Sequence, residues 1–256
     1  MADLLFLGGL DPWILIYACA VGLIAGVVKG TVGFALPMIM VSGLSSVLPA
    51  ELALAALILP TLATNTVQAL RAGLRAACET MRAYRIYLIV GGIALFISAQ
   101  GVRALPEAAF LLIIGIPITG FAALQLGGYR FSLTARTARL EALVGGFAGT
   151  MGGLAGIWGP PTVAYLTALN TSKAEQMRVQ GVVYALGSFA LVAAHMRSGV
   201  LRWETLPLSV GMVVPALIGM LIGAALQNRL NQEMFRRITL WVLLIVGLNL
   251  IRRGVF

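Results

Sequence analysis

Residues 22–37 read GLIAGVVKGTVGFALP, and residues 145–160 read GGFAGTMGGLAGIWGP. Adding 123 to each residue number carries the first stretch onto the second without a gap. The shift superimposes Gly22 on Gly145, Gly26 on Gly149, Gly30 on Gly153, Gly33 on Gly156, and Pro37 on Pro160. The sequence is therefore internally duplicated.

Each copy begins as an apolar helix with a glycine at every fourth position and then enters a glycine cluster closed by proline. Such clusters disfavour a continuous helix, because glycine frees the backbone and proline lacks an N–H donor. We expect a helix break at 29–34 and another at 153–160, both inside the hydrophobic layer. Broken helices at matching points of two repeats indicate a transporter's binding site.

The composition predicts an all-α polytopic membrane protein. Hydrophobic residues make up 60% of the 256 residues and charged residues 11%, and the mean hydropathy is +0.96. These values exclude a water-soluble core. The net charge of +9 does not indicate a nucleic-acid partner, because the arginines lie in short connections between apolar runs.

Two five-segment repeats organise the chain, the first over 1–127 and the second over 139–256, joined by an arginine-rich linker at 128–138. Each repeat starts with a broken or re-entrant helix pair followed by three spans. The predicted segments are 12–29, 35–48, 51–70, 84–104 and 107–127, then 139–153, 160–170, 175–196, 206–227 and 234–251. The pairs are either hairpins that return from mid-membrane or short tilted spans.

Each repeat crosses the membrane an odd number of times, so the second repeat is predicted to be inverted relative to the first. This parity puts twelve of the 18 Lys and Arg residues on one side and five on the other, with Lys29 inside an apolar run. The richer side is assigned to the cytoplasm, with both termini outside. It includes a loop at 71–85 that carries Arg71, Arg75, Arg82 and Arg85.

A helix that restarts after each break would aim its unpaired N–H groups and positive dipole end at the membrane centre, which favours a small anion. The alternative is that the glycines only allow close helix packing. The predicted substrate contacts are Lys29, Gly30, Thr31, Gly33, Phe34, Asn65, Gly156, Trp158, Gly159, Gln180 and Tyr184.

Lys29 is costly inside a membrane, so it either attracts the anion or snorkels to the interface. Asn65 belongs to a polar face at helical spacing with Thr61, Thr64 and Gln68, and polar faces within spans turn toward a cavity or another helix. The 123-residue shift carries Asn65 onto Ser188, on a span that also has Gln180 and Tyr184. Trp158 either walls the site or anchors a helix at the interface.

Glu51 and Glu175, 124 residues apart, stand at the starts of spans. They are interpreted as helix-start residues, with gating or proton coupling as the alternative. No motif for hydrolysis or nucleophilic catalysis is present, so the protein is not expected to be an enzyme. We also expect no cofactor and no metal site, since His195 is the single histidine and the two cysteines have no metal-ligand spacing.

The chain resembles the sulfite exporter TauE/SafE family of bacterial inner-membrane anion transporters. The resemblance covers nearly the whole chain and rests on three features: the doubled glycine-rich segment closed by proline, Pro49–Ala50–Glu51 leading into the polar face at Thr64 and Asn65, and the arginine loop between the repeats. It implies transport of sulfite, sulfonates or related organosulfur anions across a bacterial inner (plasma) membrane.

The favoured hypothesis is a secondary transporter, an exporter, of a small sulfur-containing anion such as sulfite, a sulfonate or a sulfoacetate-like organosulfonate. Alternatives are a proton-coupled importer of an organic anion and a membrane scaffold that transports nothing. The expected partners are the small anionic substrate and the lipid bilayer, and a homodimer is left open.

Overall fold

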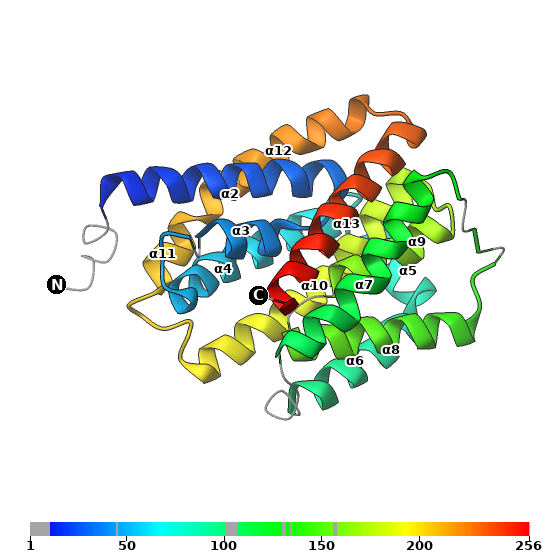
Figure 1. Ribbon diagram of the computed structural model, residues 1–256, viewed down its shortest axis with the longest axis horizontal. Helices are drawn as coiled ribbons and strands as arrows, with labels where there is room; N and C mark the ends of the chain where they lie inside the picture. The colour runs from blue at the N-terminus through cyan, green and yellow to red at the C-terminus, as the bar shows by residue number, and fades with distance from the viewer. Residues whose placement is uncertain are drawn as a thin grey trace. The chain divides into compact units, whose positions relative to one another are not determined.

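The computed structural model describes residues 11–44, 46–100, 107–129, 132–133, 135–155 and 158–255. Over these ranges the regular secondary structure is entirely α-helical. The helices in chain order are α2 (Pro12–Val32), α3 (Leu36–Leu44), α4 (Ala50–Leu70), α5 (Leu74–Ala83), α6 (Arg85–Gln100), α7 (Glu107–Leu126), α8 (Ala138–Ala155), α9 (Gly159–Ala168), α10 (Lys173–Ser198), α11 (Leu206–Gly211), α12 (Val213–Arg229) and α13 (Gln232–Val255) (Figure 1).

Five helical segments in the described ranges are long and apolar enough to cross a bilayer, and a bent helix pair adds a sixth. These segments are Pro12–Val32, Glu51–Leu70, Lys173–Arg197, Leu206–Arg229 and Gln232–Val255, and the bent pair is α5 with α6. The predicted all-α, multi-pass membrane fold is confirmed. The sequence-predicted spans at 51–70, 107–127, 175–196 and 234–251 match helices to within a few residues.

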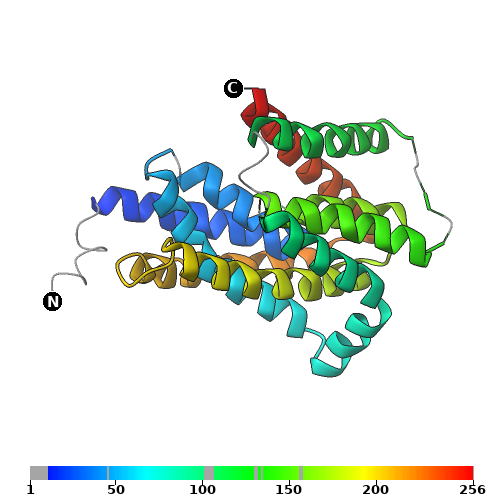
Figure 2. The same ribbon diagram turned by 90° about the horizontal axis from the view of Figure 1, so that it is seen from below.

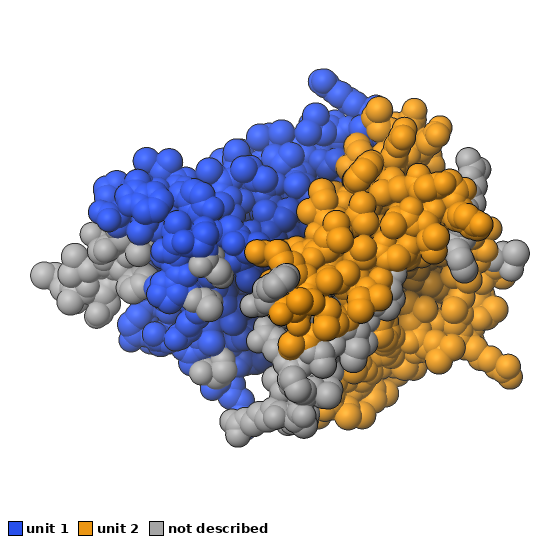
Figure 3. Space-filling view, viewed as in Figure 1, with its two compact units in different colours: residues 1–71, 184–230 blue, residues 72–183, 231–256 orange. Residues whose placement is uncertain are grey.

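The chain divides into two compact units (Figure 3). Unit 1 contains residues 1–71 and 184–230, and unit 2 contains residues 72–183 and 231–256. The boundary on the second half of the chain falls within α10, between Val183 and Tyr184. Each unit thus combines helices from both halves of the sequence.

In unit 1, α2 lies along α12, and the glycines of both helices form the contact (Figure 1). A methyl group on Gly26 would collide with the carbonyl oxygen of Ala216, and one on Gly219 would collide with that of Leu23. Two backbones approach this closely only where the side chain is a hydrogen atom. For Gly26 the packing interpretation of the glycine stripe is therefore correct.

Unit 2 has a contact of the same kind between α6 and α8. A methyl group on Gly149 would collide with the carbonyl oxygen of Gly91, and one on Gly145 would come within 2.6 Å of that of Tyr87. The glycines of α8 that make this contact are the repeat counterparts of Gly22 and Gly26 in α2. In the same unit α7 lies beside α13 (Figure 2). Gly115 and Gly247 lie at their contact.

The first helix break is shorter than predicted and begins later. Helix α2 continues through Lys29, Gly30 and Thr31 to Val32, and the break consists of Gly33, Phe34 and Ala35. Gly33 has φ 90° and its N–H donates to the carbonyl oxygen of Lys29 (2.7 Å), which ends the helix with a left-handed cap. Helix α2 is extended to this point because Gly30 is accommodated in the packed interface with α12.

Helix α3 folds back along α2, since the Tyr17 hydroxyl near the start of α2 donates to the Gly43 carbonyl near the end of α3 (3.3 Å). The 21 residues of α2 pass the length and hydropathy criteria for a span, whereas α3 has nine residues. The first pair is therefore a span-length helix followed by a short antiparallel return. In the second pair α8 ends at Ala155 and α9 starts at Gly159, which agrees with the predicted segments to within two residues.

Two segments differ from prediction. The predicted loop 71–85 contains helix α5, which is amphipathic, with Arg75, Glu79 and Arg82 three or four residues apart and so on one face. It meets α6 at 78°. The predicted span 206–227 is split at Met212 into α11 and α12; Pro215 supplies no N–H to Gly211, four residues earlier, and so weakens the helix there.

We expect Gly26→Ala and Gly149→Ala each to lower the free energy of unfolding by about 1–3 kcal/mol, because the added methyl groups overpack helix contacts. Unfolding in detergent, followed by circular dichroism, measures this. The control is Gly92→Ala in α6, where an added methyl meets nothing within 4 Å, and it should leave stability unchanged or slightly raised. Equal stability of all three variants would contradict the glycine-mediated contacts.

Candidate functional site

Lys29 lies in the last turn of α2, and its side chain is buried with 2% of its surface exposed. Its ammonium group donates to Asn65 Oδ1, to Gln68 Oε1 (2.9 Å) and to the carbonyl oxygen of Gly33 (3.4 Å). An ammonium carries three N–H donors, and three oxygens surround this one. The ammonium group of Lys29 is thus bonded both to the helix break, at Gly33, and to the polar face of α4, at Asn65 and Gln68.

Asn65 joins α4 to α10. Its amide nitrogen donates to Ser188 Oγ and to the carbonyl oxygen of Tyr184 (3.2 Å), and Ser188 Oγ donates to that carbonyl as well (2.6 Å). The Tyr184 ring centroid lies 5.6 Å from Lys29 Nζ, within the range of a cation–π interaction. Residues from three helices therefore form one continuous polar cluster, which we call the Lys29 cluster: Lys29, Gly33, Asn65, Gln68, Tyr184 and Ser188.

Local sequence explains why these side chains meet. On α4, Asn65 and Gln68 are three residues apart and share one face of the helix. On α2, Lys29 is one turn from the C-terminal end, where a cation is favoured by the helix dipole. The left-handed turn at Gly33 then directs a backbone carbonyl toward the ammonium group.

The Lys29 cluster has an unbalanced charge. All the hydrogen-bond partners of Lys29 in the described structure are neutral, and no carboxylate pairs with it there. Within unit 1 no other buried side chain of the described residues is charged. Because opposite charges attract more strongly in a low-dielectric interior than in water, this position favours a small anion.

In unit 1, α4 and the second half of α10 run in opposite directions. Asn65 contacts Ser188, whereas Glu51 at the start of α4 pairs with Arg202, which follows the end of α10. The contact Asn65–Ser188 also joins two positions that are related by the 123-residue shift.

The structure brings together four of the residues predicted from the sequence to bind substrate, namely Lys29, Gly33, Asn65 and Tyr184. Gly30 and Thr31 lie on the side of α2 that packs against α12, where the Thr31 hydroxyl donates to the carbonyls of Val27 (2.8 Å) and Gly223 (3.3 Å). Their direct substrate contact stays a prediction.

Of the remaining predicted contacts, Phe34 is buried in the helix break. Trp158 and Gly159 start α9, and the Trp158 carbonyl accepts a hydrogen bond from the Thr162 hydroxyl (2.7 Å). Gln180 is buried in the part of α10 that belongs to unit 2. Gly156 lies outside the described residues.

Gln68 and Ser188 are not among the contacts predicted from the sequence. A signal existed for both, since Gln68 follows Asn65 by three residues and the repeat shift carries Asn65 onto Ser188.

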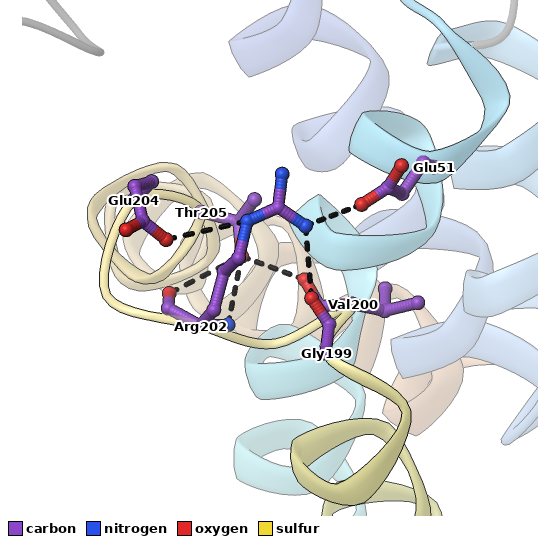
Figure 4. A network of polar contacts seen from close by, with 6 residues as sticks. All are labelled: Glu51, Gly199, Val200, Arg202, Glu204 and Thr205. Carbon is purple, nitrogen blue, oxygen red and sulfur yellow. Dashed lines mark hydrogen bonds and ion pairs between the residues drawn. The ribbon is translucent and has the colours of Figure 1, made fainter.

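Glu51 lies in the first turn of α4 and pairs with Arg202 in the loop before α11 (Figure 4). Arg202 also pairs with Glu204 (3.2 Å), and its hydrogen bond to Glu51 raises the pKa of the guanidinium group. The helix-start interpretation agrees with this position. The network is exposed, and exposed ion pairs contribute little to stability.

Glu175 lies in the first turn of α10 and accepts a hydrogen bond from the Tyr84 hydroxyl (3.0 Å) in unit 2. Nearby, Arg136 from the linker pairs with the buried Glu141 (2.8 Å) and lies over the Tyr84 ring at 4.3 Å. Burial acts to lower the pKa of Arg136, but Tyr84 and Glu141 together raise it. Arg136, which is permanently charged, thus ties its part of the linker to Tyr84 and Glu141 within unit 2.

The described residues form an all-helical protein with several helices long and apolar enough to cross a membrane, and a buried lysine lies among neutral polar groups in unit 1. The family model for the sulfite exporter TauE/SafE family matches residues 18–250, and the chain belongs to that family. Its members are membrane transporters. No curated protein and no solved structure matches the chain.

We expect Asn65→Leu to lower the free energy of unfolding by about 2 kcal/mol, because it removes an acceptor from a buried ammonium group. In the double variant Lys29→Met/Asn65→Leu the cation is absent as well, so its loss should be smaller than the sum of the two single losses. A double-mutant cycle in detergent measures the coupling. Additive losses would show that the two side chains do not interact.

A second comparison uses the two carboxylates that pair with arginine. We expect Glu141→Gln to lower the unfolding midpoint, because Glu141 is buried against Arg136. The matched change Glu51→Gln should leave the midpoint unchanged, because its ion pair is exposed. A larger effect at Glu51 would assign it a structural role beyond its exposed ion pair.

Proposed function

We propose that this chain exports a small sulfur-containing anion, such as sulfite or a sulfonate, and that the anion binds at the Lys29 cluster. The observation that carries the proposal is the buried ammonium of Lys29 beside a helix break, with neutral oxygens as its hydrogen-bond partners. Family membership supports the chemical class of the substrate.

The aromatic residues of α2 support a position for this site inside the hydrocarbon layer. Trp13 and Tyr17 lie near the start of α2, with ring centroids 6.5 Å apart, and such aromatic residues mark the membrane–water interface. Lys29 follows Tyr17 by twelve residues, or about 18 Å at 1.5 Å per residue. The hydrocarbon layer is about 30 Å thick, so Lys29 would lie inside it.

We further propose that the two five-segment repeats have inverted topology. Repeat-related helices that cross in opposite directions are expected of inverted repeats, and α4 and α10 do so at Asn65 and Ser188. The matching glycine contacts of α2 with α12 and α6 with α8 support the duplication. From this topology and the arginine bias, we propose that both termini lie outside a bacterial inner membrane.

Export is favoured over import by the membrane potential. With the inside negative, each negative charge that leaves the cell gains about 2.3 kcal/mol per 100 mV, so export needs no coupling ion. A proton-coupled importer would use Glu51 or Glu175. Glu51, however, is exposed and paired with Arg202, and Glu175 is in the first turn of α10 and bonded to Tyr84. Neither position suggests a proton path.

Efflux from proteoliposomes tests the proposal, with sulfite inside and the potential set by a potassium gradient and valinomycin. Lys29→Met should reduce efflux at least about tenfold, which corresponds to roughly 1.4 kcal/mol of lost anion stabilisation. Lys173→Met is the matched control, since Lys173 is the other lysine of the chain and lies at the start of α10 in unit 2. It should retain normal efflux.

Full efflux by folded Lys29→Met protein would contradict the proposed site. Uphill uptake driven by a pH gradient and abolished by Glu51→Gln or Glu175→Gln would support the importer instead. If the folded protein neither binds nor transports any sulfur anion, the result would support the alternative of a membrane scaffold that transports nothing.

A further inference from the structure

The Lys29 cluster offers a bound anion one positive charge. Lys29 is the buried cation of unit 1 among the described residues, and its position in the second repeat is taken by Gly152. The other buried charge in the described structure, Glu141, belongs to unit 2 and is already paired with Arg136. The second glycine-rich stretch therefore has no positive charge at the position that corresponds to Lys29.

The longest of the three hydrogen bonds of Lys29 is the one to the Gly33 carbonyl. Its bond to Gln68 has an ordinary length (2.9 Å), whereas its distance to the Gly33 carbonyl is 3.4 Å, at the long end for a hydrogen bond. Gly33 is also the residue at which α2 ends. A substrate oxygen can replace this carbonyl while the two amide oxygens keep their bonds.

A second, uncharged donor is available on the same face of α4. Thr61 precedes Asn65 by one helical turn, its side chain is 1% exposed, and its hydroxyl has no hydrogen-bond partner. Buried hydroxyl groups are normally hydrogen-bonded, so an unpaired one indicates a missing acceptor. A hydroxyl can donate to an anion without adding charge.

We infer that the site selects monovalent sulfur anions, namely sulfonates and hydrogensulfite, over divalent sulfate and sulfite. Lys29 neutralises one negative charge, and Thr61 donates a neutral hydrogen bond to a second oxygen. The second charge of a dianion has no cation to pair with in the cluster, and an unpaired buried charge is strongly disfavoured. This inference rests on the proposed function, since it concerns the same site.

Methanesulfonate and sulfate separate the two possibilities, because both have tetrahedral sulfur and differ by a methyl group in place of a charged oxygen. Binding to the purified full chain is measured by isothermal titration calorimetry at pH 8 and constant ionic strength. Methanesulfonate should bind at least about tenfold more tightly than sulfate, a difference of roughly 1.4 kcal/mol. The apparent affinity for sulfite should rise as the pH falls and hydrogensulfite forms.

Thr61→Val tests the second donor, since valine has a similar shape and no hydroxyl. We expect a several-fold weaker affinity for methanesulfonate. The matched control is Thr66→Val on the same helix. Its hydroxyl also has no partner, but it lies about 100° around α4 from Asn65, whereas Thr61 lies about 40° away. Thr66→Val should bind methanesulfonate as the unaltered protein does.

The outcomes distinguish this inference from the proposed function. Sulfate binding as tightly as methanesulfonate, with both lost in Lys29→Met, would overturn the charge selectivity and leave the anion site in place. No heat of binding for any sulfur anion, in protein that unfolds cooperatively, would overturn both. If Thr61→Val and Thr66→Val bind methanesulfonate with equal affinity, Thr61 does not contribute to the site.

Discussion

The burial of the Lys29 ammonium group among neutral oxygens is the constraint on which unit 1 is built. A buried cation without acceptors would destabilise the protein by several kcal/mol, so α2, α4 and the break at Gly33 must supply oxygens together. Asn65 is held in turn by Ser188 and the Tyr184 carbonyl on α10. The position of three helices thus depends on one charge.

Close helix packing gives this cluster its rigid support. Helix α2 lies on α12 through glycines on both helices, and the backbones touch where any side chain would separate them. The same glycine positions of the second repeat pack α8 on α6 in unit 2. The duplication therefore preserved a packing device in both copies, whereas the cation at position 29 has glycine as its counterpart. The glycine positions are thus shared by the two glycine-rich stretches, whereas the lysine occurs in the first stretch alone.

Much of the fold could be predicted because its signals are local. Apolar runs of span length and the proline-closed glycine clusters predicted most helices and both breaks. Helix α5 was not predicted, because the four arginines of segment 71–85 are typical of a loop. The spacing of its charged residues along one helix face was not considered. Glycine spacing could not separate the packing role of Gly30 from a site role, because both need the same small residue.

Lys29, Asn65 and Tyr184 were each predicted as contacts, but their meeting was not, since they lie 36 and 119 residues apart in sequence. By itself the sequence determined the class of protein, the internal duplication and the presence of a lysine within an apolar run, because hydropathy and repetition are properties of the chain alone. Only the tertiary structure decided which oxygens surround that lysine and which buried hydroxyls, Thr61 among them, lack a partner, because hydrogen bonds between helices depend on how the helices pack.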